Sequence, residues 1–163
     1  MLVNFGQNIG QRKHLIAIDK RTNMTKVFVY GTLLSGFGNN RLLEGQPFLG
    51  PAKTKPEFTL VNVGSFPGLV EGGKTAILGE VYEVDNKCLA QLDRLEGCCL
   101  EDPSRGLYGR LQIVLENGQE VTAYRYNIGR PLWSNREVIR DYEKIESGDW
   151  REFDCSHLKS YCG

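Results

Sequence analysis

The dipeptide Asn117-Gly118 constrains the fold of this chain more than any other feature of its sequence. It separates two runs in which apolar and polar residues alternate, 111–115 and 121–126. Asn-Gly readily adopts the backbone angles of a tight turn, and alternation is typical of strands that bury one face. The sequence therefore predicts a β-hairpin here, within a sheet that further strands complete.

Three more segments have the composition of strands. Residues 27–30 are Val-Phe-Val-Tyr, a continuous β-branched and aromatic run that is typical of a buried strand. Residues 58–63 and 77–84 are further candidates. Phe66-Pro67-Gly68, by contrast, is most simply interpreted as a turn. The tail 142–153, which a glycine interrupts, fits no single pattern.

One helix is indicated in the middle of the chain. Asp85 or Asn86 can cap its start, and Gly97 can end it. Apolar residues recur between these ends at helical spacing, at Cys88, Leu89, Leu92 and Leu95. A second short helix is predicted over 40–44. Five or more short strands with one or two helices indicate an α+β fold, a small mixed β-barrel with flanking helices.

The composition limits the class of protein. The 163 residues include 20 basic and 20 acidic side chains. A net charge of zero argues against binding nucleic acid or anionic lipid by bulk electrostatics. No apolar run approaches the roughly 20 residues of a membrane-spanning helix, and the run 15–18 is too short for a signal-peptide core. We therefore expect a soluble, cytoplasmic protein with neither nucleic acid nor membrane as a partner.

Residues 24–153 are expected to form a single domain. The preceding segment, 1–23, is polar and has no clean period. It is either an extension that packs on the domain or a stretch before a natural start at Met24. Residues 154–163 are expected to form a C-terminal tail. The oligomeric state is left open.

Motifs for a metal, a nucleotide or a nucleophilic triad are weak. Cys98 and Cys99 are adjacent, and Cys155, His157 and Cys162 do not have the usual spacing of zinc ligands. The five cysteines are most simply free thiols, some of them packed as small hydrophobic residues. No G-x-G-x-x-G follows a strand, and no serine lies in a G-x-S-x-G frame. No cofactor and no metal are expected.

Glu96 is the first residue that could carry chemistry. It lies on the apolar face of the predicted helix, four residues after Leu92 and at the C-terminal end. Burial and the helix dipole would both raise the pKa of its carboxyl group towards that of a general base near neutral pH. Asp93 would add to this effect if it faced the same side. The alternative is a last-turn glutamate that points into water.

The loop Gly31-Thr32-Leu33 is the second such feature. It follows directly on the buried strand, and glycine lets the backbone turn sharply there. Such a loop can direct its N–H groups at a carboxylate or a developing oxyanion without using a charged side chain.

These segments, taken in order, resemble the γ-glutamylcyclotransferase-like family, which includes γ-glutamylamine cyclotransferase and AIG2-like proteins. Residues 27–33, Val-Phe-Val-Tyr-Gly-Thr-Leu, are similar to the family's opening strand and loop. Residues 92–97, Leu-Asp-Arg-Leu-Glu-Gly, are similar to its helix-end motif. Further similar segments follow the family's order, at 66–70, 79–84, 108–110, 123–126 and 147–150.

The resemblance implies a fold and a reaction. The family fold is a small mixed β-barrel with flanking helices. The implied reaction cleaves a γ-glutamyl amide by attack of its own α-amino group, which releases 5-oxoproline and a free amine. Glu96 would be the catalytic acid and base. The implied substrate-binding residues are Tyr30, Gly31, Thr32, Leu33 and Tyr126.

Two alternatives stay open beside this interpretation. The chain could be a barrel of the same fold that binds a small metabolite or partner without catalysis, although the presence of Glu96 favours an enzyme. It could also be a glutathione-directed enzyme, although it resembles the short amine-type members of the family more closely. Tyr108 and Arg110 resemble the family's Tyr-x-Arg pair and are expected first to be structural. Arg110 could instead pair with Glu96 or with an acidic group of the substrate. The amine part of the substrate is not predicted.

Overall fold

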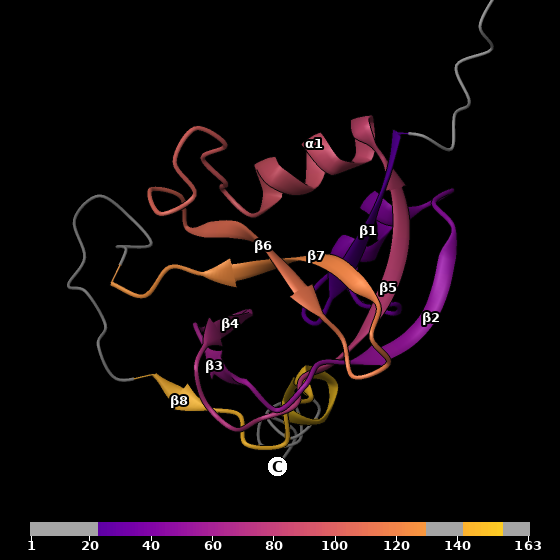
Figure 1. Ribbon diagram of the computed structural model, residues 1–163. Coiled ribbons are helices and arrows are strands. Elements are labelled where there is room, and N and C mark those ends of the chain that lie inside the picture. The colour runs from indigo at the N-terminus through magenta and orange to yellow at the C-terminus, as the bar shows by residue number, and fades with distance from the viewer. Residues whose placement is uncertain (1–22, 130–141, 155–163) are drawn as a thin grey trace, which may run out of the picture.

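A computed structural model describes residues 23–129 and 142–154. Its strands belong to one mixed sheet that curls into a half-barrel, and the helix α1 lies at one end (Figure 1). The elements are β1 (Met24–Val29), the 3-10 helix η2 (Gly38–Leu43), β2 (Phe48–Lys53), β3 (Phe58–Asn62), β4 (Pro67–Glu71), β5 (Leu78–Asp85), α1 (Asn86–Leu95), β6 (Tyr108–Val114), β7 (Glu120–Tyr126) and β8 (Glu143–Lys144). The predicted α+β class is confirmed.

The predicted hairpin is confirmed as β6 and β7. The two strands pair antiparallel from Tyr108↔Tyr126 to Val114↔Glu120. Gly118 in the turn has a φ of +83°, a left-handed angle that glycine adopts without strain. The strand candidates 27–30, 58–63 and 77–84 correspond to β1, β3 and β5, with ends shifted by at most three residues.

The sheet forks at β7. One edge of β7 pairs with β6 along its whole length. The other edge is shared by two parallel neighbours, β1 at Val27↔Thr122 and Phe28↔Ala123, and β4 at Leu69↔Arg125. From there the sheet continues through β1 to β5 and β2, and through β4 to β3 and β8.

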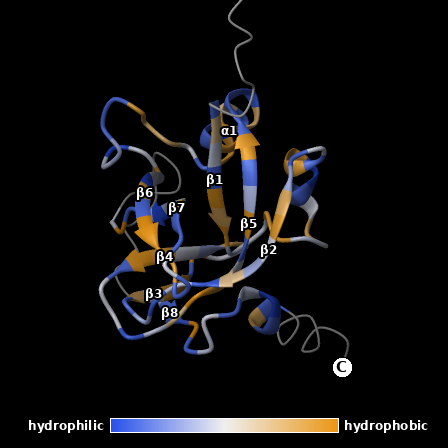
Figure 2. Cartoon of the chain, turned by 45° about the vertical axis from the view of Figure 1, so that its right-hand side comes forward, coloured by the Kyte–Doolittle hydropathy of each residue, from blue (hydrophilic) through white to orange (hydrophobic). Residues whose placement is uncertain are grey.

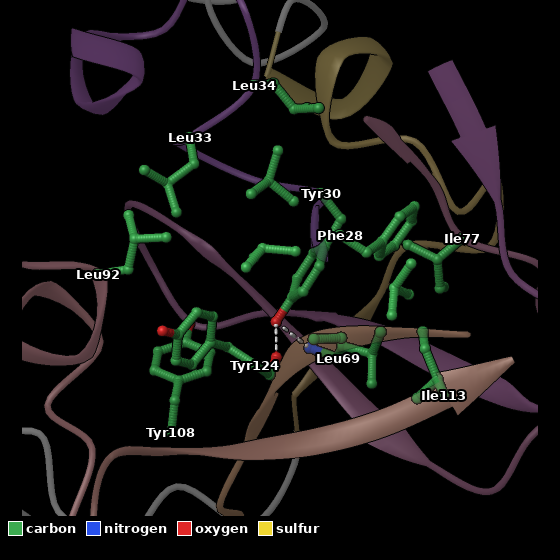
Figure 3. Packing of buried hydrophobic residues seen from close by; sticks show 14 of the residues in the cluster. Phe28, Tyr30, Leu33, Leu34, Leu69, Ile77, Leu92, Tyr108, Ile113 and Tyr124 are labelled. Carbon is green, nitrogen blue, oxygen red and sulfur yellow. Dashed lines mark hydrogen bonds between the residues drawn. The ribbon is translucent and has the colours of Figure 1, made fainter. Parts of the chain in front are cut away.

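Tyr30 fills this fork. Its buried hydroxyl donates a hydrogen bond to the carbonyl of Tyr124 in β7 at 2.5 Å and accepts one from the N–H of Leu69 in β4 at 3.1 Å (Figure 3). The hydroxyl therefore takes the place of a direct backbone hydrogen bond between the two strands, so both buried backbone groups are satisfied.

The core fills the inner side of the curl. Its fully buried side chains come from several strands and from α1, and they include Phe28, Leu69 and Leu92 (Figure 3). In Figure 2 the hydrophobic colour is concentrated on strands such as β1, β4 and β6, whereas the connecting loops are mostly hydrophilic. Burial of each large apolar side chain contributes about 1.5–3 kcal/mol.

Helix α1 begins and ends as the sequence predicts. The Asp85 side chain caps it by accepting a hydrogen bond from the N–H of Cys88 at 2.7 Å. Gly97, with a φ of +61°, ends it. One part of the prediction is wrong, because Leu95 is 39% exposed, whereas Asp93 is buried on the inner face.

Three other segments differ from expectation. Phe66-Pro67-Gly68 is not simply a turn, because Pro67 is the first residue of β4. Proline has no N–H to donate, and the first residue of a strand is a position where this is tolerated. The second helix is the 3-10 helix η2 rather than a helix over 40–44. The tail 142–153 holds the two-residue strand β8 and then a helical turn that begins at Trp150.

Candidate active site

A cavity of about 320 Å³ lies where the end of β1, the start of β4 and the last turn of α1 meet. Five of the six site residues expected from the sequence are in its wall: Tyr30, Gly31, Thr32, Leu33 and Glu96. A volume of this size is at the lower end of the range for small-molecule sites.

The loop after β1 contributes Gly31, Thr32 and Leu33 to the wall of this cavity. The N–H of Leu34 donates to the carbonyl of Gly31 at 3.0 Å and closes a tight turn. The N–H groups of Gly31, Thr32 and Leu33 donate to no group within residues 23–129 and 142–154. The described part of the fold therefore leaves these three backbone donors unused.

Gly31 lets this loop lie close to β4. A Cβ atom at this position would come within 2.7 Å of Cγ of Pro67, which is closer than real Cβ contacts allow. The ring of Pro67 is fixed at the start of β4, so a larger residue at position 31 would push the loop away from its place in the wall.

Glu96 is the acid in this wall. It follows directly on α1, where its N–H donates to Leu92 at 2.9 Å and its carbonyl accepts from the N–H of Tyr108 at 3.2 Å. Its side chain keeps some solvent contact, yet protein atoms closely surround the carboxyl group. That carboxyl group has no hydrogen-bond partner among the described residues. Burial raises the pKa of Glu96 from 4.5 to about 8.

Asp93 does not contribute to this shift. Its buried carboxylate accepts hydrogen bonds from Arg110, through Nε at 2.8 Å and through Nη2, and from the hydroxyl of Tyr124 at 2.8 Å. Arg110 thus pairs with Asp93 rather than with Glu96, which agrees with its expected structural role. The sequence analysis named Asp93 and Arg110 but did not foresee this pair.

Tyr108, which shares the cavity wall with Glu96, packs against a second tyrosine, Tyr126. The ring of Tyr108 is in the cavity wall, and its hydroxyl donates to the carbonyl of Pro67 at 2.6 Å. Tyr126 is buried but is not in the wall. Its ring packs edge-on against Tyr108 with centroids 5.4 Å apart, and its hydroxyl shares a hydrogen bond of 2.9 Å with that of Tyr142.

A buried carboxylate that the sequence analysis missed holds the loop from the other side. Glu80 in β5 accepts hydrogen bonds from the N–H of Ser35 at 2.9 Å and from its hydroxyl at 2.6 Å. Arg151 donates to the same carboxylate at 2.7 Å and to the carbonyl of Ser35 at 2.7 Å. All three polar groups of Ser35 are therefore fixed.

The charge of Glu80 is maintained in this setting. Burial by itself would raise the pKa of the carboxyl group, but the hydrogen bonds from Ser35 and Tyr82 and the charge of Arg151 outweigh it and lower the pKa. The only signal for this group in the sequence was the occurrence of a glutamate within a predicted strand, at a position that faces the core of the protein.

Cys98 lies close to two acidic residues, Asp93 and Glu96. Burial is the largest cause that raises the pKa of its thiol, and the charges of Asp93 and Glu96 add to it, so the pKa is about 12 and Cys98 is a poor nucleophile. No group of three potential metal ligands occurs in the described segments, and Cys155, His157 and Cys162 lie outside them. None of the helices described has the length and hydropathy needed to cross a bilayer.

Comparisons with known proteins identify relatives by sequence. The profile of the family described as "Gamma-glutamyl cyclotransferase, AIG2-like" matches residues 27–152. A Vibrio cholerae protein, named provisionally as a γ-glutamylcyclotransferase, is 42% identical over 124 residues, which make up 76% of this chain and 93% of that protein. A Bos taurus protein named γ-glutamylaminecyclotransferase is 34% identical over 137 residues, 77% of this chain and 79% of that protein.

The fold has a solved counterpart as well. The crystal structure of an AIG2-like protein from Mus musculus superimposes with a TM-score of 0.55 at 28% sequence identity, over 74% of this chain and 89% of that one. The family profile and the relatives agree with the resemblance found in the sequence. The chain belongs to the γ-glutamylcyclotransferase family of AIG2-like proteins.

Proposed function

We propose that this protein cleaves γ-glutamyl amides by cyclisation, releasing 5-oxoproline and a free amine. The observation that carries the proposal is the carboxyl group of Glu96, which has no hydrogen-bond partner among the described residues and a pKa of about 8. It shares a cavity wall with the three free N–H groups of the loop 31–33. Membership of the family supports a γ-glutamyl substrate.

This reaction needs few groups from the protein. The nucleophile and the electrophile belong to the same molecule, and well-oriented intramolecular attack reaches effective molarities of about 10⁵ M or more. The remaining tasks are proton transfer and stabilisation of the oxyanion, which one carboxyl group and a few backbone donors can perform.

The proposed sequence of steps begins at the substrate's α-ammonium group. It gives one proton to the Glu96 carboxylate, and the resulting amine attacks the γ-carbonyl carbon to close a five-membered ring. The carbonyl oxygen becomes an oxyanion and accepts hydrogen bonds from the N–H groups of Gly31, Thr32 and Leu33. The carbonyl then re-forms as the bond to the leaving nitrogen breaks, and Glu96 protonates that nitrogen. The ring nitrogen gives its second proton to the regenerated Glu96 carboxylate, which passes it to the released amine, so the amine departs as an ammonium ion.

The tyrosines are assigned supporting parts. The hydroxyl of Tyr30 already has two partners, so Tyr30 would border the substrate with its ring rather than donate to it. Tyr126 would act through Tyr108, against which it packs, and not by direct contact.

The test is a panel of γ-glutamyl amides with 5-oxoproline detected by mass spectrometry. Wild-type protein is expected to release 5-oxoproline and the free amine. The Glu96→Gln variant should lose roughly 10²–10⁴-fold in rate, whereas Glu101→Gln, the same change at an exposed neighbour, should not. Release of glutamate would mean that water attacks instead. No product from any amide would favour a non-catalytic barrel that binds a small metabolite.

A further inference from the structure

We propose that the amine released by this protein carries an uncharged, apolar substituent, which lies in the mouth of the cavity. The inference rests on the proposed function and specifies its substrate class.

The mouth can be located from the exposure of the residues in the cavity wall. Phe28 and Tyr124 are buried in the core and close the inner end. Leu95 is 39% exposed, and Phe66 and Leu107 are half-buried, so these three apolar residues border the opening. They come from the last turn of α1, the turn between β3 and β4, and the residue before β6.

The rest of the rim is polar but uncharged. It consists of Thr32, Asn39 and Ser65, and the amide of Asn39 already donates to the hydroxyl of Thr32 at 3.0 Å. Among the described residues of the wall, Glu96 is the only one of the types Asp, Glu, Lys, Arg and His. The nearby Asp93 is taken by Arg110 and Tyr124 and offers no carboxylate to a second cation.

These features separate possible leaving groups by their charge. The γ-carbonyl must lie at the loop 31–33 and the leaving nitrogen at Glu96, so the substituent on that nitrogen extends along the remaining wall towards the rim. An alkyl or arylalkyl group would gain from burial against Phe66, Leu95 and Leu107. A second ammonium or a carboxylate there would lose water without gaining a partner.

Two isosteric substrates test this directly. γ-Glutamyl-pentylamide and γ-glutamyl-4-aminobutylamide differ only in a terminal methyl group against a terminal ammonium. We expect kcat/KM, measured by 5-oxoproline release, to be roughly tenfold or more higher for the pentylamide. Titration calorimetry with the Glu96→Gln variant is expected to give a lower Kd for the pentylamide than for the aminobutylamide. Equal values, or a preference for the aminobutylamide, would overturn the inference.

The two readouts separate this inference from the proposed reaction. Equal release of 5-oxoproline from both amides would support the reaction and contradict the apolar mouth. Selective binding of the pentylamide by Glu96→Gln, with no 5-oxoproline from wild type, would support the apolar mouth and contradict the reaction. No binding of either amide would overturn the inference.

A charge placed at the rim gives a second test. Ser65 is exposed on the turn before β4, so Ser65→Asp adds a carboxylate to the mouth with little effect on packing. The ratio of kcat/KM values should shift several-fold towards the aminobutylamide. Ser65→Asn has nearly the same shape without the charge and should leave the ratio unchanged. An unchanged ratio in Ser65→Asp would contradict the position given to the amine.

Discussion

At the level of single residues, the site contrasts two acidic groups three positions apart. Asp93 is buried with an arginine and a tyrosine as partners, whereas Glu96 is left without a hydrogen bond among the described residues. The first arrangement holds α1 to β6 and β7. The second leaves a carboxyl group whose proton can be exchanged near neutral pH, which is what a general base requires.

The raised pKa of Glu96 predicts the pH dependence of the reaction. Because the substrate arrives as an ammonium ion, the free enzyme must hold Glu96 as a carboxylate. kcat/KM should therefore rise roughly tenfold per pH unit up to about pH 8, and fall again where the substrate's own ammonium group loses its proton. Cys98→Ser should show the same rise of kcat/KM with pH, since burial puts the pKa of that thiol at about 12. A rise of kcat/KM that ended near pH 4.5 would show that the carboxyl group of Glu96 is fully hydrated.

Tyr30 gives a prediction about stability. Tyr30→Phe removes the hydroxyl that satisfies the carbonyl of Tyr124 and the N–H of Leu69, and leaves both buried groups without that partner. The free energy of unfolding, measured in urea, should fall by about 1–3 kcal/mol. Tyr126→Phe is the matched control, because it removes a single hydrogen bond to another side chain and should cost about 0.5–1.5 kcal/mol. Equal losses would contradict the role of Tyr30 in the fork.

At the level of elements, the sequence predicted those segments whose local pattern matches their environment. The hairpin, β1 and α1 have strong turn, strand or capping signals of their own. β2 was missed because Gly50 and Pro51 break its pattern and most of it is exposed at the edge of the sheet. β4 was taken for a turn because it begins with Pro67-Gly68. β2 pairs with the distant β5, and β4 pairs with the neighbouring β3 and with the distant β7; no local pattern records the two distant pairings.

The candidate site shows the same limit. Glu96 and the loop 31–33 could be predicted, because a helix end and a strand end are local features. The Glu80–Ser35–Arg151 network could not, because its members are 45 and 116 residues apart in sequence and meet only in the folded chain. Tyr126 was expected to contact substrate, but its place behind Tyr108 depends on the register of the hairpin and on Tyr142.

That network predicts how the C-terminal helical turn affects catalysis. Arg151→Gln removes the donors to the carbonyl of Ser35 and to Glu80, and so loosens the segment that follows the backbone donors of the loop. kcat should fall by roughly tenfold or more with little change in KM, because misplaced donors weaken binding of the oxyanion more than of the substrate. The control is Arg125→Gln, which breaks the exposed ion pair with Glu71 and leaves the Glu80–Ser35–Arg151 network intact. Equal kcat values for the two variants would contradict a positioning role.

At the level of the whole molecule, the fold assembles one cavity from segments that are distant in the chain. The fork at β7 separates β1 from β4, and the end of α1 lies beside the start of β6 (Figure 1). The carbonyl of Glu96 accepts a hydrogen bond from the N–H of Tyr108 in β6, and the carbonyl of Gly97 accepts one from Leu107, the residue before β6. A carboxyl group enclosed at this junction destabilises the folded state whenever it is ionised. The carboxylate form of Glu96, which the proposed reaction requires, should therefore lower the free energy of unfolding.

This trade-off can be measured through the pH dependence of unfolding. Between pH 4.5 and about 8 the unfolded chain has lost the proton of Glu96, whereas the folded protein retains it. The unfolded state then binds fewer protons, so this group lowers stability as pH rises, by up to about 1.4 kcal/mol per pH unit. Gln cannot ionise, so the free energy of unfolding of Glu96→Gln should exceed that of wild type by little at pH 4. The excess should grow up to about pH 8 and stay constant above it.

Urea unfolding of wild type, Glu96→Gln and Glu101→Gln across this range gives the comparison. The free energy of unfolding of wild type is subtracted from that of each variant at every pH, which removes the contribution of every other carboxyl group. Glu80 is one of these, and its lowered pKa makes stability rise with pH in the acidic range. Glu101→Gln is the control, because it makes the same change at an exposed residue. A difference for Glu96→Gln that stays flat across this range would mean that the Glu96 carboxylate is as well hydrated in the folded protein as in the unfolded chain. The base required for cyclisation at neutral pH would then have to be sought elsewhere in the cavity.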